Sequence, residues 1–164
     1  MTSPVDSATP GVGIAPGCPH PLGVTPVADG VDAAVWAPEA TRIELCVFAK
    51  DDSETRIVLP GFTEGVWHGH VPGIAPGTRY GFRATGPRSA SSAHRFNPAK
   101  LLIDPYTQLL EGPVRWHPWQ SGHDPHDSAA VVPKCVVPRP AHAGDTPRRD
   151  PDPASNRPGH PRAD

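Results

Sequence analysis

Apolar and polar residues alternate with a period of two along the middle of the chain. In the first such segment Val31, Ala33 and Val35 share one face, and Asp32 and Trp36 share the other. This period is typical of half-buried strands. We expect five strands, within residues 31–37, 41–49, 55–59, 65–71 and 78–85. Glycine, proline and aspartate clusters separate them roughly every 8–12 residues, which predicts an all-β fold, a β-sandwich.

Two sheets that meet face to face would bury every second side chain of these strands. The predicted core residues are Val35, Ile43, Leu45, Val47, Leu59, Trp67, Tyr80 and Phe82. A core of this size can stabilise a domain of about 100 residues. A further apolar segment, residues 129–137, contains Pro133, which favours an edge strand over a central one.

Trp36 stands at an even-numbered position, whereas Val31, Ala33 and Val35, the apolar residues of its segment, stand at odd-numbered ones. If Val31, Ala33 and Val35 face the core, the Trp36 ring lies on the other face of the sheet. An exposed aromatic ring is a flat platform for a sugar ring or for a partner domain. The alternative is that the two faces are reversed and Trp36 belongs to the core. The short strand leaves both interpretations open.

Composition divides the chain into three parts. Proline is over-represented, with 24 residues in 164. Residues 1–19 hold little apolar surface and predict a flexible leader, whereas residues 20–137 carry the predicted sandwich. Residues 138–164 contain no valine, isoleucine, leucine, methionine or aromatic residue. Because such a segment cannot bury enough apolar surface to offset its ordering entropy, we expect a disordered Pro/Arg-rich tail.

Charge and composition exclude several functional classes. The formal net charge of −2 offers no basic field for nucleic acid or an anionic membrane. No apolar run approaches the roughly 20 residues that span a bilayer, and residues 1–6 lack the features of a secretory signal. The three cysteines are an odd and widely spaced set, unlike a disulfide framework. We therefore expect a cytoplasmic protein.

No pattern indicates a reaction centre or a cofactor. Phosphate-loop, dinucleotide, nucleophile-elbow and zinc-protease motifs are absent from the sequence. His117, His123 and His126 lie in a Gly/Pro/Asp-rich segment whose spacing does not suit a metal site, so a polar surface loop is the simpler interpretation. The acidic residues fall in turns or on exposed strand faces, and Asp104, before a proline, is expected to cap its own turn. We predict no catalytic residue, no metal and no cofactor.

Several stretches in order resemble the amino-terminal part of bacterial glycogen debranching enzymes of the isoamylase type, in glycoside hydrolase family 13. They begin with Pro-Leu-Gly at 21–23, Val-Trp-Ala-Pro-Glu-Ala at 35–40 and Arg-Ile-Glu-Leu-Cys-Val-Phe at 42–48. The most specific is Arg-Phe-Asn-Pro-Ala-Lys-Leu-Leu-Ile-Asp-Pro-Tyr at 95–106. The resemblance runs to about residue 137.

The resemblance implies an immunoglobulin-like β-sandwich of the glycogen-binding-module type. In the family this domain precedes a (β/α)₈ barrel that hydrolyses α-1,6 branch linkages, and we expect this chain to end before such a barrel, which needs about 250 residues. A truncated or frameshifted product and a genuine short protein both fit that expectation.

The resemblance also implies the roles of individual residues. Trp36 matches a tryptophan that contacts glucan in related modules, whereas Arg95, Phe96 and Asn97 would dock a catalytic domain. The expected partners are therefore α-glucan (glycogen), bound weakly, or a catalytic barrel that the domain only braces.

Overall fold

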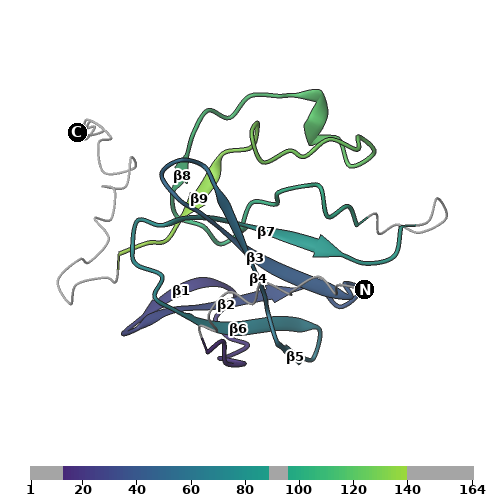
Figure 1. The fold of residues 1–164 in the computed structure, drawn as a ribbon. Helices are drawn as coiled ribbons and strands as arrows, with labels where there is room; N and C mark the ends of the chain where they lie inside the picture. The colour runs from purple at the N-terminus through teal and green to yellow at the C-terminus, as the bar shows by residue number, and fades with distance from the viewer. Residues whose placement is uncertain (1–12, 89–95, 140–164) are drawn as a thin grey trace, which may run out of the picture.

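The computed structural model describes residues 13–88 and 96–139, which form two antiparallel sheets stacked face to face (Figure 1). The four-stranded sheet has the order β1 (Gly23–Val27), β2 (Gly30–Trp36), β6 (Val66–Pro72) and β5 (Gly61–Thr63). The five-stranded sheet has the order β4 (Glu54–Val58), β3 (Arg42–Phe48), β7 (Arg79–Thr85), β9 (Lys134–Val136) and β8 (Leu110–Glu111). One short 3-10 helix, η1 (Pro118–Gln120), lies in the loop between β8 and β9. The predicted all-β sandwich is confirmed.

The core between the sheets consists of the residues that the alternation selects. Ile43, Leu45, Leu59, Tyr80 and Phe82 are buried in one cluster, and Val35, Val47 and Trp67 pack against it. Alternate side chains of paired antiparallel strands point to the same face, so each sheet contributes one apolar face. All eight predicted core residues therefore occupy this interface or its margin.

The strand pattern differs from the sequence prediction at short elements. β1, β5 and β8 were not expected: β5 and β8, with three and two residues, are too short to establish a period, and β1 lies before the first alternating segment. The apolar segment 129–137, expected at a sheet edge, provides β9 instead, which lies between β7 and β8. Pro133 is compatible with this place because it precedes the strand and withholds no ladder hydrogen bond.

A long loop, residues 96–133, covers the outer face of the five-stranded sheet and builds a second core there. Cys46 and Phe48 of β3 and Leu101 of the loop are buried together, with Ala129 and Val132 packed against them. Gly81 allows this approach, because a Cβ at Gly81 would lie 2.7 Å from the Leu101 side chain. Burial raises the pKa of the Cys46 thiol, with the Glu54 carboxylate adding to the effect.

Three buried cationic side chains hold the loop in place. Lys100 donates hydrogen bonds to the carbonyls of Trp119 (2.6 Å) and His126 (2.7 Å). Lys134 donates to two further loop carbonyls and lies over the Phe48 ring, 4.9 Å from its centroid. Arg83, on the same outer face, binds Glu54 and Asp127. Lys100 and Lys134 thus satisfy backbone carbonyls of the loop, and Arg83 binds its Asp127 side chain.

The segments flanking the sandwich are described only in part. Ala15, within the predicted leader, exchanges two backbone hydrogen bonds with His70 at the edge of β6 (3.3 and 2.8 Å), which the composition did not predict. The rest of the predicted leader, 1–12, and the predicted tail from residue 140 onwards lie outside the described residues. In the described ranges no helix is long and apolar enough to cross a membrane.

Candidate functional site

Trp36 ends β2 on the outer face of the four-stranded sheet. Its residue surface is 64% exposed, while Val31 and Ala33 of the same strand are fully buried in the core. Of the two interpretations that the sequence left open for Trp36, the structure supports the exposed one and not the one in which the ring enters the core. Its neighbour across the sheet is Val66 of β6, which is buried.

Hydrogen bonds fix the backbone on which the Trp36 ring stands. The Ala37 amide donates to the Gly65 carbonyl (2.9 Å), which extends the β2–β6 ladder by one residue beyond the strand. From the inner face, the Trp67 indole Nε1 donates to the Ala37 carbonyl (3.2 Å). The residue after Trp36 is therefore held from both sides, and a platform held in this way loses little entropy on binding.

The turn between β5 and β6 supports the indole ring. Glu64 (φ 49°) and Gly65 (φ 85°) are its two central residues, and two positive φ values are the mark of the tight hairpin turn that suits twisted strands. A Cβ at Gly65 would lie 3.3 Å from Trp36 Nε1 and 3.2 Å from the Pro38 side chain. Glycine at this position lets the ring lie close over the turn.

Two carboxylates stand at the Trp36 platform. Glu39 follows Pro38 and Glu64 precedes Gly65, and both are exposed. Neither carboxylate has a hydrogen bond or ion pair within the described ranges, so both remain available to accept from a ligand's hydroxyl groups. Apolar stacking surface next to a few polar groups is the usual composition of a sugar-binding surface.

Two histidines occupy the outer face of the same sheet, farther along β6. His68 lies within hydrogen-bond distance of Thr63 Oγ1 (3.0 Å) and the Pro16 carbonyl (2.6 Å). His70 contacts Asp32 (2.9 Å) and Asp29 (3.4 Å), and the hydrogen bond to Asp32 raises the pKa of His70. The His68 ring ties residue 16 to the sheet and the His70 ring binds two carboxylates, so both rings are structural rather than ligand-binding.

The residues predicted to dock a catalytic domain are placed differently from one another. Arg95 lies outside the described residues. Phe96 is half-buried against the main core. Asn97 is buried, and its amide donates to the carbonyls of Gly122 (3.0 Å) and Asp124 (3.2 Å) while its oxygen accepts from the Ala99 amide. Asn97 thus connects two parts of the covering loop.

The apolar residues of the covering loop are largely exposed, a feature that sequence reasoning missed. Trp116 is 84% and Val114 78% exposed. Together with Leu102, Ile103, Val132 and Pro133 they line a hollow of about 500 Å³, which we call the Trp116 surface. Of the three consecutive apolar residues Leu101, Leu102 and Ile103, only Leu101 is buried. The alternation of apolar and polar residues does not indicate that Trp116 is exposed, because this residue lies in an irregular loop.

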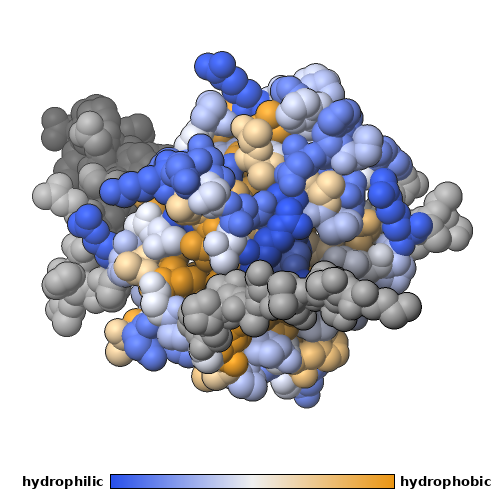
Figure 2. All heavy atoms as spheres, viewed as in Figure 1, coloured by the Kyte–Doolittle hydropathy of each residue, from blue (hydrophilic) through white to orange (hydrophobic). Residues whose placement is uncertain are grey.

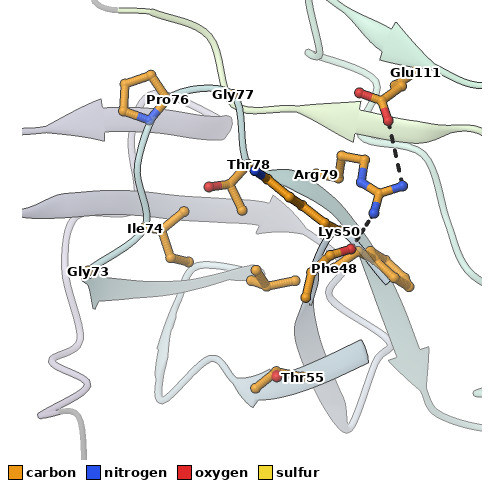
Figure 3. A pocket seen from close by; sticks show the side chains of 12 residues that line it. Phe48, Lys50, Thr55, Gly73, Ile74, Pro76, Gly77, Thr78, Arg79 and Glu111 are labelled. Atoms are coloured by element: carbon orange, nitrogen blue, oxygen red, sulfur yellow. Dashed lines mark hydrogen bonds and ion pairs between the residues drawn. The ribbon is translucent and has the colours of Figure 1, made fainter. Parts of the chain in front are cut away.

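A larger hollow, of about 720 Å³, opens where the turn after β3 meets the segment before β7 (Figure 3). Lys50, Ile74, Thr78 and Arg79 are among its lining residues. Its aromatic residue, Phe48, is buried and offers no exposed ring face. This hollow therefore lacks the stacking surface that Trp36 has.

Carboxylates and histidines do not form a reaction centre in the described ranges. Asp52 and Glu111 line one common hollow, but both are partners of Arg79 (2.7 and 3.5 Å). His117 caps η1, and the His126 ring stacks on Trp119. Within residues 13–88 and 96–139 no three potential ligands gather as a metal site would require. Around these loops the exposed surface is mainly polar, with apolar side chains in small groups (Figure 2).

Several solved structures are similar to part of this chain at low sequence identity. The catalytic module of a multi-modular glycogen-degrading pneumococcal virulence factor, solved with an inhibitor, is 21% identical over 73% of this chain and 16% of that one (TM-score 0.50). A pullulanase from Bacillus acidopullulyticus is 18% identical over 73% and 12% (TM-score 0.48). The Group B Streptococcus pullulanase in complex with maltotetraose is 20% identical over 73% and 14% (TM-score 0.48). This chain thus spans less than a fifth of their length.

A family match covers most of the sandwich. Residues 21–107, from the start of β1 through β7 and into the covering loop, match Carbohydrate-binding module 48, the isoamylase N-terminal domain. The match includes Trp36 and its supporting turn, as well as the Arg95–Tyr106 stretch that carries the resemblance in the sequence. The chain therefore belongs to the carbohydrate-binding module 48 family.

Proposed function

We propose that this domain binds α-glucan through Trp36, as the non-catalytic amino-terminal module of a glycogen debranching enzyme. The observation that carries the proposal is the exposed indole of Trp36, held over the β5–β6 turn in a member of a carbohydrate-binding family. The C–H face of a glucose ring stacks on such an indole, while Glu39 and Glu64 can accept from sugar hydroxyls. The parent activity would be hydrolysis of α-1,6 branch linkages, for which the domain would hold the polymer near a catalytic barrel.

Affinity electrophoresis in gels containing glycogen tests this role. We expect glycogen to retard the wild-type domain and Trp36→Ala to lose at least about tenfold in affinity, since anchor tryptophans contribute about 2 kcal/mol or more. Trp116→Ala removes a still more exposed indole at another surface and should be retarded like the wild type. Unchanged mobility of the wild type in glycogen, or equal retardation of Trp36→Ala, would remove the binding role.

A second role, bracing a catalytic domain, is favoured by the Trp116 surface. Val114 and Trp116, the two most exposed large apolar residues of the described ranges, gather with Leu102 and Ile103 around one hollow. Gln120 at this hollow already donates to the carbonyls of Arg115 and Val131, so the surface is suited to contact with another polypeptide more than with a sugar. The partner we infer is the catalytic domain of a debranching enzyme.

Sedimentation of the domain mixed with a debranching-enzyme catalytic domain that lacks its own module measures this association. We expect a complex that Trp116→Ala weakens at least about tenfold, as a central interface tryptophan does. Trp36→Ala should associate normally. The bracing role fails if no complex forms, or if Trp116→Ala and Trp36→Ala associate equally well.

A further inference from the structure

Lysine and arginine are absent from the part of the sandwich that presents Trp36, where the raised pKa of His70 favours a cation that Asp29 and Asp32 already pair. Residues 1–41 and 57–78, which include the whole four-stranded sheet and its turns, contain no lysine or arginine. In the described part of these ranges the acidic residues are Asp29, Asp32, Glu39 and Glu64. All ten lysines and arginines that the structure describes belong to the five-stranded sheet and its loops.

The carboxylates that matter most are the two nearest the platform. Glu39 is three residues from Trp36, so their Cα atoms are at most about 11 Å apart. Glu64 is next to Gly65, whose Cβ position lies 3.3 Å from Trp36 Nε1. Asp29 and Asp32, by contrast, are partners of His70. Two exposed carboxylates without an ion pair in the described ranges therefore belong to the turns that follow Trp36 and that lie beneath its ring.

Among the residues that the structure describes, no lysine or arginine is paired with either carboxylate. The nearest basic residue along the chain is Arg42, which begins β3 in the opposite sheet and already binds Glu44 at 2.6 Å. Two like charges about 10 Å apart in water repel each other enough to change an equilibrium by about a factor of two. Two carboxylates would thus weaken an anionic ligand about fourfold at low salt, and the effect would fade once the Debye length falls to about 8 Å.

We infer that the Trp36 platform selects neutral glucan and rejects glucan that carries phosphate or carboxylate groups. The inference rests on the proposed glucan binding at Trp36 and adds the class of polymer that the site takes. Neutral glucose units donate hydroxyl hydrogen bonds to Glu39 and Glu64, whereas an anionic group on the polymer can only be repelled by them. A debranching module of this kind would engage unmodified regions of a polymer in preference to phosphorylated ones.

Titration calorimetry of the full chain with glycogen and with carboxymethylated glycogen made from the same batch tests this selectivity. Binding of neutral glycogen should be independent of salt, whereas the anionic polymer should bind about fourfold more weakly at 10 mM NaCl and approach the neutral polymer at 150 mM. Glu39→Gln/Glu64→Gln keeps both side-chain shapes and should abolish the difference. Glu111→Gln, on the opposite sheet, should retain it.

Different outcomes of this experiment refute the charge selectivity alone or the proposed glucan binding as well. Equal binding of both polymers by the wild type at 10 mM NaCl overturns the selectivity but leaves glucan binding intact. A discrimination that does not change with salt, or that survives in the double variant, also overturns it, because it then arises from shape. If neutral glycogen itself does not bind, both the selectivity and the proposed function are refuted.

Discussion

Replacing Arg83 with methionine should destabilise the domain by about 3–5 kcal/mol, the usual cost of breaking a buried ion pair. The Arg83 side chain is 0% exposed. It donates to Glu54 (2.6 and 2.9 Å), to Asp127 (2.9 Å) and to the Pro98 carbonyl (2.9 Å). Without it, the mostly buried Glu54 carboxylate loses its principal partner and the covering loop loses its link to β7. Urea unfolding followed by tryptophan fluorescence measures the difference.

Arg56 is the matched control, because it contacts the same two carboxylates from the surface. Its side chain is 43% exposed and lies 3.1 Å from Glu54 and 3.6 Å from Asp127. Exposed pairs contribute about 0–1 kcal/mol, so Arg56→Met should unfold nearly like the wild type. Equal losses in the two variants would show that burial of Arg83 is unimportant.

The pH dependence of the Arg83→Met effect has a definite sign. Burial tends to raise the pKa of Glu54, but the hydrogen bond and charge of Arg83 lower it below its ordinary value. In the wild type this lowered pKa contributes stability that is lost as the pH falls through it. In the variant only the hydrogen bond of Cys46 and the charge of Arg56 still oppose burial, so the pKa of Glu54 is higher than in the wild type and the loss of stability is largest above that pKa. The gap between the two proteins should therefore be larger at pH 7 than at pH 4.

The fold could be predicted from the sequence wherever a strand is long enough to show its period. β2, β3 and β7 each have seven residues, and their inward side chains, such as Leu45 and Phe82, follow the alternation. β5 and β8, with three and two residues, leave no such signal and depend on pairing with β6 and β9. Pairing of this kind is a tertiary property that local patterns do not contain.

The alternation also could not show that both faces of the five-stranded sheet are covered. Polar residues on the outer face, including Glu44 and Arg83, suggest an exposed surface, yet both are buried beneath the loop. Their burial depends on partners distant in sequence, such as Asp127, 44 residues from Arg83. The Trp116 surface was missed for the same reason: an irregular loop has no period from which exposure can be deduced.

Part of the candidate site was nevertheless visible in the sequence. Because Trp36 alternates with Val31 and Ala33 along the strand, its ring could be expected on the opposite face of the sheet from theirs. The short segment did not settle which face is buried, and the register of β2 with β6 does. Its support by Gly65 was not predictable, because it requires the β5–β6 turn to lie beneath the ring. Charge segregation between the sheets likewise emerges only after the strands are assigned to sheets.

Asp104→Ala should be the second strongly destabilising substitution, by about 2–4 kcal/mol, because a buried donor left without its acceptor costs about 1–3 kcal/mol and a turn cap about one more. As its position before a proline predicted, Asp104 caps its own turn, accepting from the Tyr106 amide (2.8 Å). It also accepts from the buried Tyr80 hydroxyl (2.7 Å), a contact that the sequence did not reveal. Burial, together with this hydrogen bond, raises the pKa of Tyr80.

Asp51 is the matched control for the turn contact of Asp104. It caps a similar turn through Ser53 (3.1 Å) but is exposed. Asp51→Ala should cost about 1 kcal/mol or less, the value of the turn contact alone. In a double-mutant cycle measured by urea unfolding, Tyr80→Phe/Asp104→Ala should lose less than the two single variants together, because neither partner is then left unpaired. Additive losses would mean that the hydroxyl–carboxylate contact does not join the covering loop to the core, and that Asp104 acts through its turn alone.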